Sequence, residues 1–177
     1  QSYDTEGFFC AVLRKTATTR RKEWVDAVKF QEEEVPRARS EKLGQILAAQ
    51  FGTPFLQEGE RLFQRGEHLL LSTEAVMKFA LTTQNYSLGL PFALRFDGDR
   101  LRLDHEIASL RGHRATLGVV EIGDAQLDLF LDGKDASGPT EARGDVILLH
   151  RGMPIGMALA RDGHLKNRLP RWIVQKS

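Results

Sequence analysis

The pattern of hydrophobic and polar positions along the chain predicts many short strands and short helices. Continuous apolar runs bounded by turn residues are typical of buried strands, and apolar residues three or four positions apart are typical of helices. A capping residue before such a helix and a glycine after it mark its two ends. In chain order the pattern predicts a strand at 7–13, a helix introduced by Pro36 and Ser40 that runs to about Gln50 and stops at Gly52, strands at 61–64 and 68–71, a helix capped by Ser72 or Thr73, strands at 93–96 and 100–103, helices capped by Asp104 and by Asp124, and strands at 145–150, 153–160 and 164–167.

The turns and the helix faces refine this pattern. Arg65-Gly66 and Asp97-Gly98-Asp99 each separate two strands and predict hairpins, because glycine tolerates a positive φ. Gly156, inside its strand, predicts a bulge or a close backbone approach. Because strands and short helices are intermixed, we expect an α+β fold with a small curved sheet or barrel at the carboxyl end. The residues expected on buried helix faces are Ala75, Val76, Phe79 and Ala80, then Ile107 and Leu110, then Leu127, Phe130 and Leu131.

Charge is distributed unevenly along a chain whose formal net charge is only +1. Residues 14–22 contain five basic residues and no acidic one, and residues 161–177 contain five basic residues against Asp162 alone. Local positive patches of this kind can bind phosphate even where the total charge is near zero. The alternative interpretation is that both clusters are solvated surfaces.

Cysteine usage and apolar segments indicate the compartment. Cys10 is the only cysteine, which excludes an intramolecular disulfide and fits a reducing environment. No segment approaches the roughly 20 consecutive apolar residues of a membrane span. The first residues also lack the basic region of a signal peptide. We therefore expect a cytoplasmic protein that does not enter a membrane.

Motifs of catalysis and metal binding are missing from the sequence. No glycine-rich phosphate loop follows a strand and opens a helix. The five histidines show neither HExxH nor the paired spacing of a metal site. His105-Glu106 is the nearest arrangement to an acid–base pair, and we interpret it as a surface pair at a helix start. A hydrolase that uses His105 or His150 stays an alternative, because triad partners need only be close in space.

Stretches near the two ends of the sequence match a known family. Residues 6–15 read EGFF-x-A-x-LRK, and the carboxyl end contains Met153-Pro154-Ile155-Gly156 and the run Leu165-Lys166-Asn167-Arg168-Leu169-Pro170-Arg171. Together these stretches resemble the NOL/NOP/Sun family of ribosomal RNA cytosine-C5 methyltransferases, in particular its RsmF-like branch, which methylates a cytosine of 16S ribosomal RNA. Weaker agreement at residues 62–71 and 101–110 extends the resemblance over nearly the whole chain.

The resemblance implies that this chain is the C-terminal part of such an enzyme. The family's S-adenosylmethionine loop, acidic ribose ligand and two cysteines lie upstream of the EGFF phrase, and Cys10 matches neither cysteine. The resemblance therefore implies no catalytic, cofactor-binding or metal-binding residue here. It implies a remnant of the last methyltransferase strand plus a linker at 1–20, an α+β connecting domain at 21–95 and a PUA-like RNA-binding β-barrel module at 96–177. The implied partners are 16S ribosomal RNA or the small ribosomal subunit, and the enzyme's own methyltransferase domain.

The last hairpin supplies the predicted RNA contacts. Arginine and lysine at turns and edge positions reach outward to phosphates, and an asparagine can bond a sugar or a base edge. Trp172, beside Ile173-Val174, favours a core position over stacking on a base. Lys134 and Arg143 are further candidate contacts. The residues predicted to bind RNA are Arg151, Arg161, Lys166, Asn167, Arg168 and Arg171.

Two other functions stay open at this point. The chain is alternatively a stand-alone PUA-like RNA-binding protein with no enzyme partner, or a protein-interaction domain whose basic clusters are only solvated. The target nucleotide and the oligomeric state are also open. Without neighbouring strands, we expect the strand at 7–13 to be disordered, packed on the rest of the chain, or paired with another copy.

Overall fold

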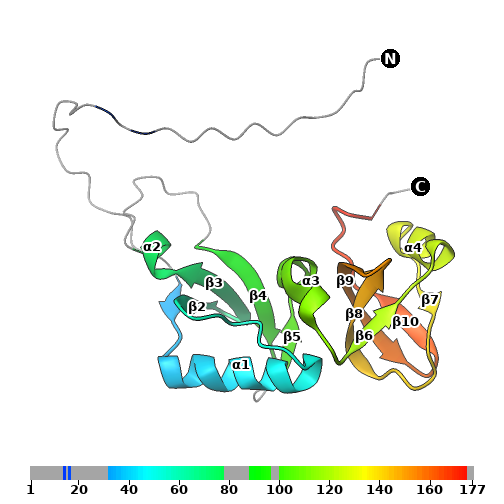
Figure 1. The fold of residues 1–177 in the computed structure, drawn as a ribbon, viewed down its shortest axis with the longest axis horizontal. Helices are drawn as coiled ribbons and strands as arrows, with labels where there is room; N and C mark the ends of the chain where they lie inside the picture. The colour runs from blue at the N-terminus through cyan, green and yellow to red at the C-terminus, as the bar shows by residue number, and fades with distance from the viewer. Residues whose placement is uncertain (1–13, 15, 17–31, 78–87, 97–99, 175–177) are drawn as a thin grey trace.

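The computed structural model describes residues 32–77, 88–96 and 100–174, together with the single positions 14 and 16. Within these residues the strands form two five-stranded sheets accompanied by short helices (Figure 1). This arrangement confirms the predicted α+β fold with small antiparallel and mixed sheets. The strand expected at residues 7–13 lies outside the described residues.

The first sheet is an antiparallel meander in which each strand pairs with the next one along the chain. The predicted hairpin around Gly66 is confirmed, and so is the pairing of the strands on either side of residues 97–99, which themselves lie outside the described residues. Helix α1 (Arg37–Phe51) covers one face of this sheet (Figure 1). The strands are β1 (Glu33–Glu34), β2 (Glu60–Arg65), β3 (His68–Thr73), β4 (Leu90–Arg95) and β5 (Leu101–Leu103).

Helix α1 follows the local signals in its sequence. Pro36 precedes the first turn, and Gly52 ends the helix in the left-handed conformation with a φ of 70°. Leu43, Leu47 and Phe51, at helical spacing, have no exposed surface and pack in the core beneath the sheet. Burial of each such side chain contributes about 1.5–3 kcal/mol. The predicted helix and its stop are therefore confirmed, and these three residues form its apolar face.

The second sheet is mixed and curls into a half-barrel at the carboxyl end of the chain (Figure 1). Its strand β6 runs parallel to β8, while the other neighbouring pairs are antiparallel. Helix α4 (Asp124–Leu131) inserts Phe130 into the core of this sheet beside Leu148 and Leu165. The curved C-terminal sheet predicted from the sequence is confirmed. Its strands are β6 (Val119–Glu121), β7 (Ala136–Ser137), β8 (Gly144–His150), β9 (Met153–Arg161) and β10 (His164–Asn167).

Helix α3 (His105–Arg111) lies between the two sheets and contacts β4 of the first and β9 of the second (Figure 1). As predicted, Asp104 caps it by accepting a hydrogen bond from the backbone N–H of His105 at 2.8 Å. Ile107 is fully buried in a core that also contains Ile147 and Met157 of the second sheet. The two sheets therefore share one hydrophobic core through α3.

Gly156 marks a close approach between the second sheet and α3. Its φ is 146°, and a Cβ atom there would lie 2.4 Å from Leu169 Cδ2 and 2.7 Å from His105 Nδ1. The β8–β9 register also shifts nearby, between Leu148 and Leu149. The irregularity predicted from this glycine is thus confirmed, and only glycine fits the space.

Several predictions about the helices are wrong in detail. Leu110, expected inward, is 56% exposed, and Val76 is 45% exposed beside an exposed Ala75. Helix α2 is described only at Glu74–Met77, so the predicted faces of residues 79 and 80 lie outside the described residues. Gly123, not Asp124, is the N-cap of α4, where Gln126 Oε1 accepts a hydrogen bond from the Gly123 N–H at 2.8 Å.

No helix in the described part of the chain is long and apolar enough to cross a membrane.

Candidate functional site

The register of the second sheet places acidic and basic side chains on the face whose Ile147 and Met157 pack into the shared core, toward the end of the strands beyond that core. Asp145 of β8, Leu159 of β9 and Lys166 of β10 stand directly opposite one another. Because side chains alternate between the faces of a strand, Arg161 lies on the same face as Leu159. Lys166 and Arg161 are exposed there, whereas Val146, on the other face, is buried in the core. Two of the predicted cations, Arg161 and Lys166, therefore project from the same face of this sheet.

Arg168 joins this face by reaching back across the sheet to Asp145. The two side chains form an ion pair and are 25% and 18% exposed, respectively. Burial lowers the pKa of the Arg168 guanidinium, Asp145 raises it, and the positive charges of Arg102 and Arg100 lower it further. Arginines of the first sheet therefore lie close enough to Arg168 for their charges to repel it.

Arg100 and Arg102 come from β5 and the residues just before it. Their guanidinium carbons lie 5.0 and 5.4 Å from the centre of the Phe96 ring, the geometry of cation–π contacts. No ion pair joins either arginine to a carboxylate among the described residues. We call the surface formed by Arg100, Arg102, Arg161, Lys166 and Arg168 the basic face.

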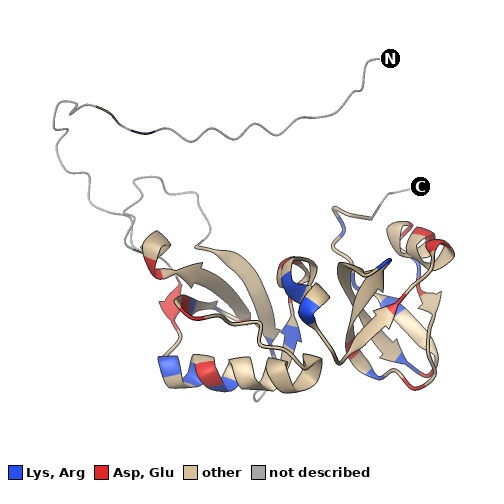
Figure 2. Cartoon of the chain, in the orientation of Figure 1, with Lys and Arg blue, Asp and Glu red and all other residues tan. Residues whose placement is uncertain are grey.

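Figure 2 shows the wider distribution of charge. Basic positions appear on β5, on α3 and on the strands of the second sheet, while β1, α2 and α4 carry acidic positions. Helix α1 also carries basic positions beside an acidic one, and the second sheet carries acidic positions among its basic ones. A local cluster of cations can attract anions even where the net charge is small.

Arg151 lies apart from the other predicted contacts. It occupies the turn before β9, whereas Arg161 ends that strand, nine residues long, so the two are about 30 Å apart along the backbone. Arg151 Nη2 lies 3.0 and 3.1 Å from the two carboxylate oxygens of Asp124. The structure therefore does not bring Arg151 into the basic face, and its RNA contact stays a prediction.

Asn167 holds α4 against the sheet. Its Nδ2 donates to the backbone oxygens of Phe130 at 2.7 Å and Lys134 at 3.2 Å, while its Oδ1 accepts from the Leu169 N–H at 2.8 Å. These bonds use both amide hydrogens. The predicted RNA contact of Asn167 stays a prediction, but the side chain already has a structural role.

Arg171 and Trp172 follow the basic face in the sequence, and both are exposed. Trp172 is 74% exposed, so the interpretation that it seals a core is wrong. Its ring contacts His105 edge-on, with the ring centres 5.7 Å apart. The indole therefore presents most of its surface to solvent, as a residue that stacks on a base does.

His105 and Glu106 at the start of α3 both have shifted pKa values. Burial lowers the pKa of His105, against an opposing effect of Asp104. Burial, reinforced by Asp104, raises the pKa of Glu106 to about 7. The shift of the His105 pKa favours the neutral imidazole, and Glu106 is partly protonated at neutral pH. Ser109 Oγ lies 3.3 Å from His105 Nε2, a bond within one helix rather than a catalytic arrangement. The Asp104 carboxylate lies on this side of the basic face, in the lining of one small hollow with Arg102 and Arg168.

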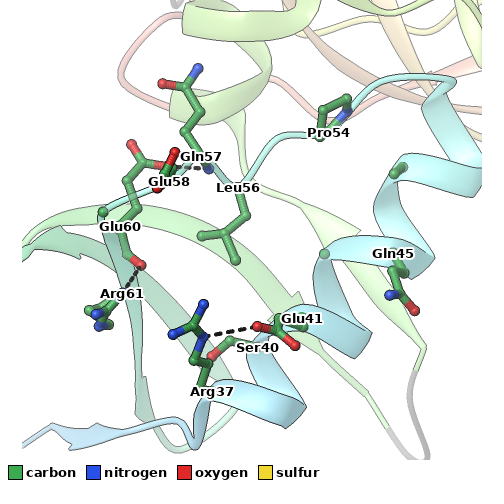
Figure 3. A pocket seen from close by; sticks show the side chains of 13 residues that line it. Arg37, Ser40, Glu41, Gln45, Pro54, Leu56, Gln57, Glu58, Glu60 and Arg61 are labelled. Carbon is green, nitrogen blue, oxygen red and sulfur yellow. Dashed lines mark hydrogen bonds and ion pairs between the residues drawn. The ribbon is translucent and has the colours of Figure 1, made fainter.

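A hollow of about 450 Å³ lies away from the basic face, between α1 and the loop that leads to β2 (Figure 3). Its charged side chains have partners of their own: Arg37 Nε lies 3.0 Å from Glu41 Oε1, and Glu60 Oε2 accepts the Gln57 N–H at 2.8 Å. This hollow therefore has no excess positive charge. Within the described residues, no three histidine, cysteine or acidic side chains gather as metal ligands.

The sequence alone did not identify Arg100, Arg102 and Phe96 as part of the site. Two arginines on either side of Leu101, beside an aromatic residue at a hairpin, were the available signal. So short a pattern does not predict a binding site by itself. These residues join the site only because the fold brings the hairpin beside Arg168. The basic face is therefore a product of tertiary structure rather than of one basic run.

Known proteins resemble this chain throughout its length. Residues 118–175 match the family described as Methyltransferase RsmF PUA domain. Proteins named ribosomal RNA small subunit methyltransferase F are 32% identical in Aeromonas hydrophila, 27% in Psychromonas ingrahamii and 29% in Shewanella oneidensis, each over 99% of this chain. The chain spans only about 37% of the length of each of these relatives.

Proposed function

Because this chain is a relative of the RsmF methyltransferases and carries their PUA domain at residues 118–175, we propose that it binds ribosomal RNA for a catalytic domain outside this sequence. In this proposal the RNA is 16S ribosomal RNA, free or within the small subunit. The whole protein transfers a methyl group from S-adenosylmethionine to a cytosine C5 in the cytoplasm. The S-adenosylmethionine and the catalytic cysteine belong to the other domain.

The observation that carries the proposal is the convergence of Arg102, Lys166 and Arg168 from two sheets with one carboxylate, Asp145, paired among them. Arginines and lysines gathered on one face are the usual partners of RNA phosphates, and here Arg161 also pairs with Asp162 at 3.2 Å. The predicted division of the chain at residues 20 and 95 stays part of the proposal. The first sheet extends to Leu103, so any connecting domain contributes Arg102 to the same surface.

The physical role of such binding follows from the chemistry of the target base. A cytosine in folded RNA must leave its stack before its C5 atom can react, at a cost of a few kcal/mol. Contacts made away from the reacting base offset that cost and select the substrate. We assign this role to the basic face, which in this proposal positions the RNA for catalysis.

The salt dependence of binding tests this function. The chain should bind a 16S ribosomal RNA fragment with an affinity that falls steeply as salt rises, because each phosphate contact releases bound counterions. Lys166→Ala should make the log–log slope less steep by about 0.7–0.9, the value of one lost phosphate contact. Filter binding over a range of salt concentrations measures both slopes.

Arg39→Ala is the matched control, because Arg39 is an exposed cation on α1. This helix covers the face of the first sheet that carries Leu101 and Leu103, and Arg102, between them, lies on the opposite face. It should leave the slope unchanged. Equal slopes for Lys166→Ala and the unmodified chain would remove Lys166 from the RNA interface. Absence of RNA binding at low salt would instead favour a protein-interaction domain with solvated basic clusters.

A further inference from the structure

A small cavity of about 250 Å³ opens where the two sheets meet, within the basic face. Its apolar lining includes Leu94 of β4, Met157 of β9 and Pro170, and its charged lining is Arg102, Asp104 and Arg168. Met157 is buried, whereas Leu94 and Pro170 are partly exposed at the opening. We call this space the junction cavity.

We propose that the junction cavity binds one unstacked nucleotide of single-stranded RNA, with its base against Leu94, Met157 and Pro170 and its phosphate between Arg102 and Arg168. This inference rests on the proposed function, which it makes specific. It assigns the cavity a base-sized ligand, whereas the rest of the basic face contacts only the backbone.

The size of the junction cavity favours a single base. Pockets for drug-sized ligands occupy about 300–1,000 Å³, so a cavity of about 250 Å³ accommodates one flat ring system and excludes a duplex. A base inside a duplex has both faces stacked and cannot enter. The cavity therefore selects a nucleotide that has already left its stack, as in a loop, a bulge or a single-stranded end.

The charges at the junction cavity favour a phosphate. Arg168 is half-buried, the charges of Arg102 and Arg100 repel its own, and Asp145 pairs with only its Nη1 atom. Two arginines line the cavity against one carboxylate, Asp104. A guanidinium has five N–H donors, so Arg168 keeps donors for another anion. A bound phosphate would relieve the repulsion between these arginines and accept bidentate hydrogen bonds.

An exposed aromatic ring stands next to the junction cavity. His105 lines the cavity and contacts the indole of Trp172 edge-on at 5.7 Å between ring centres. A nucleotide in the cavity thus has a neighbouring platform on which the next base of the strand can stack. Proteins hold single-stranded RNA by such elements: an apolar slot for a base, a pair of arginines for the phosphate and an aromatic ring on which a second base stacks.

The first test uses the unmodified chain and three fluorescent RNA probes: a single strand, the same strand with abasic sites, and the duplex. Anisotropy titrations should give about tenfold tighter binding of the intact strand than of either other probe, the usual effect of one stacked base. Equal binding of all three probes would overturn the junction cavity as a base site and leave the proposed function standing. No binding of any probe would overturn both.

The second test fills the junction cavity. Leu94→Trp should weaken binding of the single strand about tenfold while the salt slope stays that of the unmodified chain, because no charge is removed. Leu110→Trp, the same substitution at a position 56% exposed on α3, is the control and should leave affinity unchanged. Thermal unfolding confirms that both variants are folded. Unchanged affinity of folded Leu94→Trp would overturn the proposal, and the abasic comparison decides it if that variant does not fold.

Discussion

Arg111→Met should lower the free energy of unfolding by about 3 kcal/mol or more, the usual cost of removing one partner of a buried ion pair. Arg111 Nη2 lies 2.5 Å from Glu60 Oε1 and its Nη1 lies 2.9 Å from Glu60 Oε2, and the same Nη1 donates to the backbone oxygen of Phe55. The two side chains are only 13% and 11% exposed. The substitution leaves the Glu60 carboxylate buried without its counter-charge. Urea unfolding at neutral pH measures the loss.

The pH dependence and a double variant complete this test. Burial raises the pKa of Glu60, but hydrogen bonds from Arg111 and the Gln57 N–H outweigh it, so the net shift is downward. A lowered folded-state pKa means that the pair stabilises the fold above the unfolded pKa of the carboxyl and ceases to do so as the pH falls through the folded value. The difference between the two proteins should therefore shrink in acid. Arg111→Met with Glu60→Leu should recover most of the loss, and equal stability of the single variant at neutral pH would contradict the account.

Arg102→Glu combined with Lys166→Glu should weaken RNA binding by more than about 100-fold at moderate salt. Each lost hydrogen bond between a charged group and a phosphate is worth about 1.5–3 kcal/mol, so two losses exceed a factor of 100 before the new repulsion is counted. Both positions lie at or near the surface, so the fold should persist, which circular dichroism checks. Titration of labelled 16S ribosomal RNA fragments measures the change.

The control carries the same change of net charge elsewhere on the molecule. Arg37→Glu with Arg39→Glu alters two exposed cations of α1, on the covered side of the first sheet. It should reduce affinity by much less than the first pair, since only long-range attraction changes and salt screens it within about 10 Å. Equal losses in the two double variants would mean that net charge, not the basic face, governs binding.

Local signals in the sequence predicted the elements that depend on neighbouring residues. The α1 helix between Pro36 and Gly52, the hairpin at Gly66 and the irregularity at Gly156 all follow from backbone preferences of proline and glycine. The short strands β1, β6 and β7 did not, because two or three residues carry no period and form only when a partner strand is already present. Helix periodicity also gave a wrong prediction for Leu110. Ile107 is fully buried in the core, whereas Leu110, three residues further along α3, is 56% exposed.

The candidate site was only partly predictable for a related reason. The cluster of basic residues at the carboxyl end predicted Lys166 and Arg168 as contacts, and the structure places both on one face with Arg161. It could not reveal Arg102, which belongs to a different sheet, or the pairing of Arg168 with Asp145. Such pairings depend on how distant strands meet. A basic cluster in a sequence therefore predicts a surface that attracts anions, whereas the tertiary structure determines which residues form that surface.

Ultraviolet cross-linking of the chain to a 16S ribosomal RNA fragment, followed by mass spectrometry of the linked peptides, tests the central claim most directly. The basic face and the exposed Trp172 predict cross-links concentrated in the peptides that contain Phe96 and residues 164–174. Cross-links confined to peptides of α1, with none at Phe96 or Trp172, would contradict the assignment of the RNA surface.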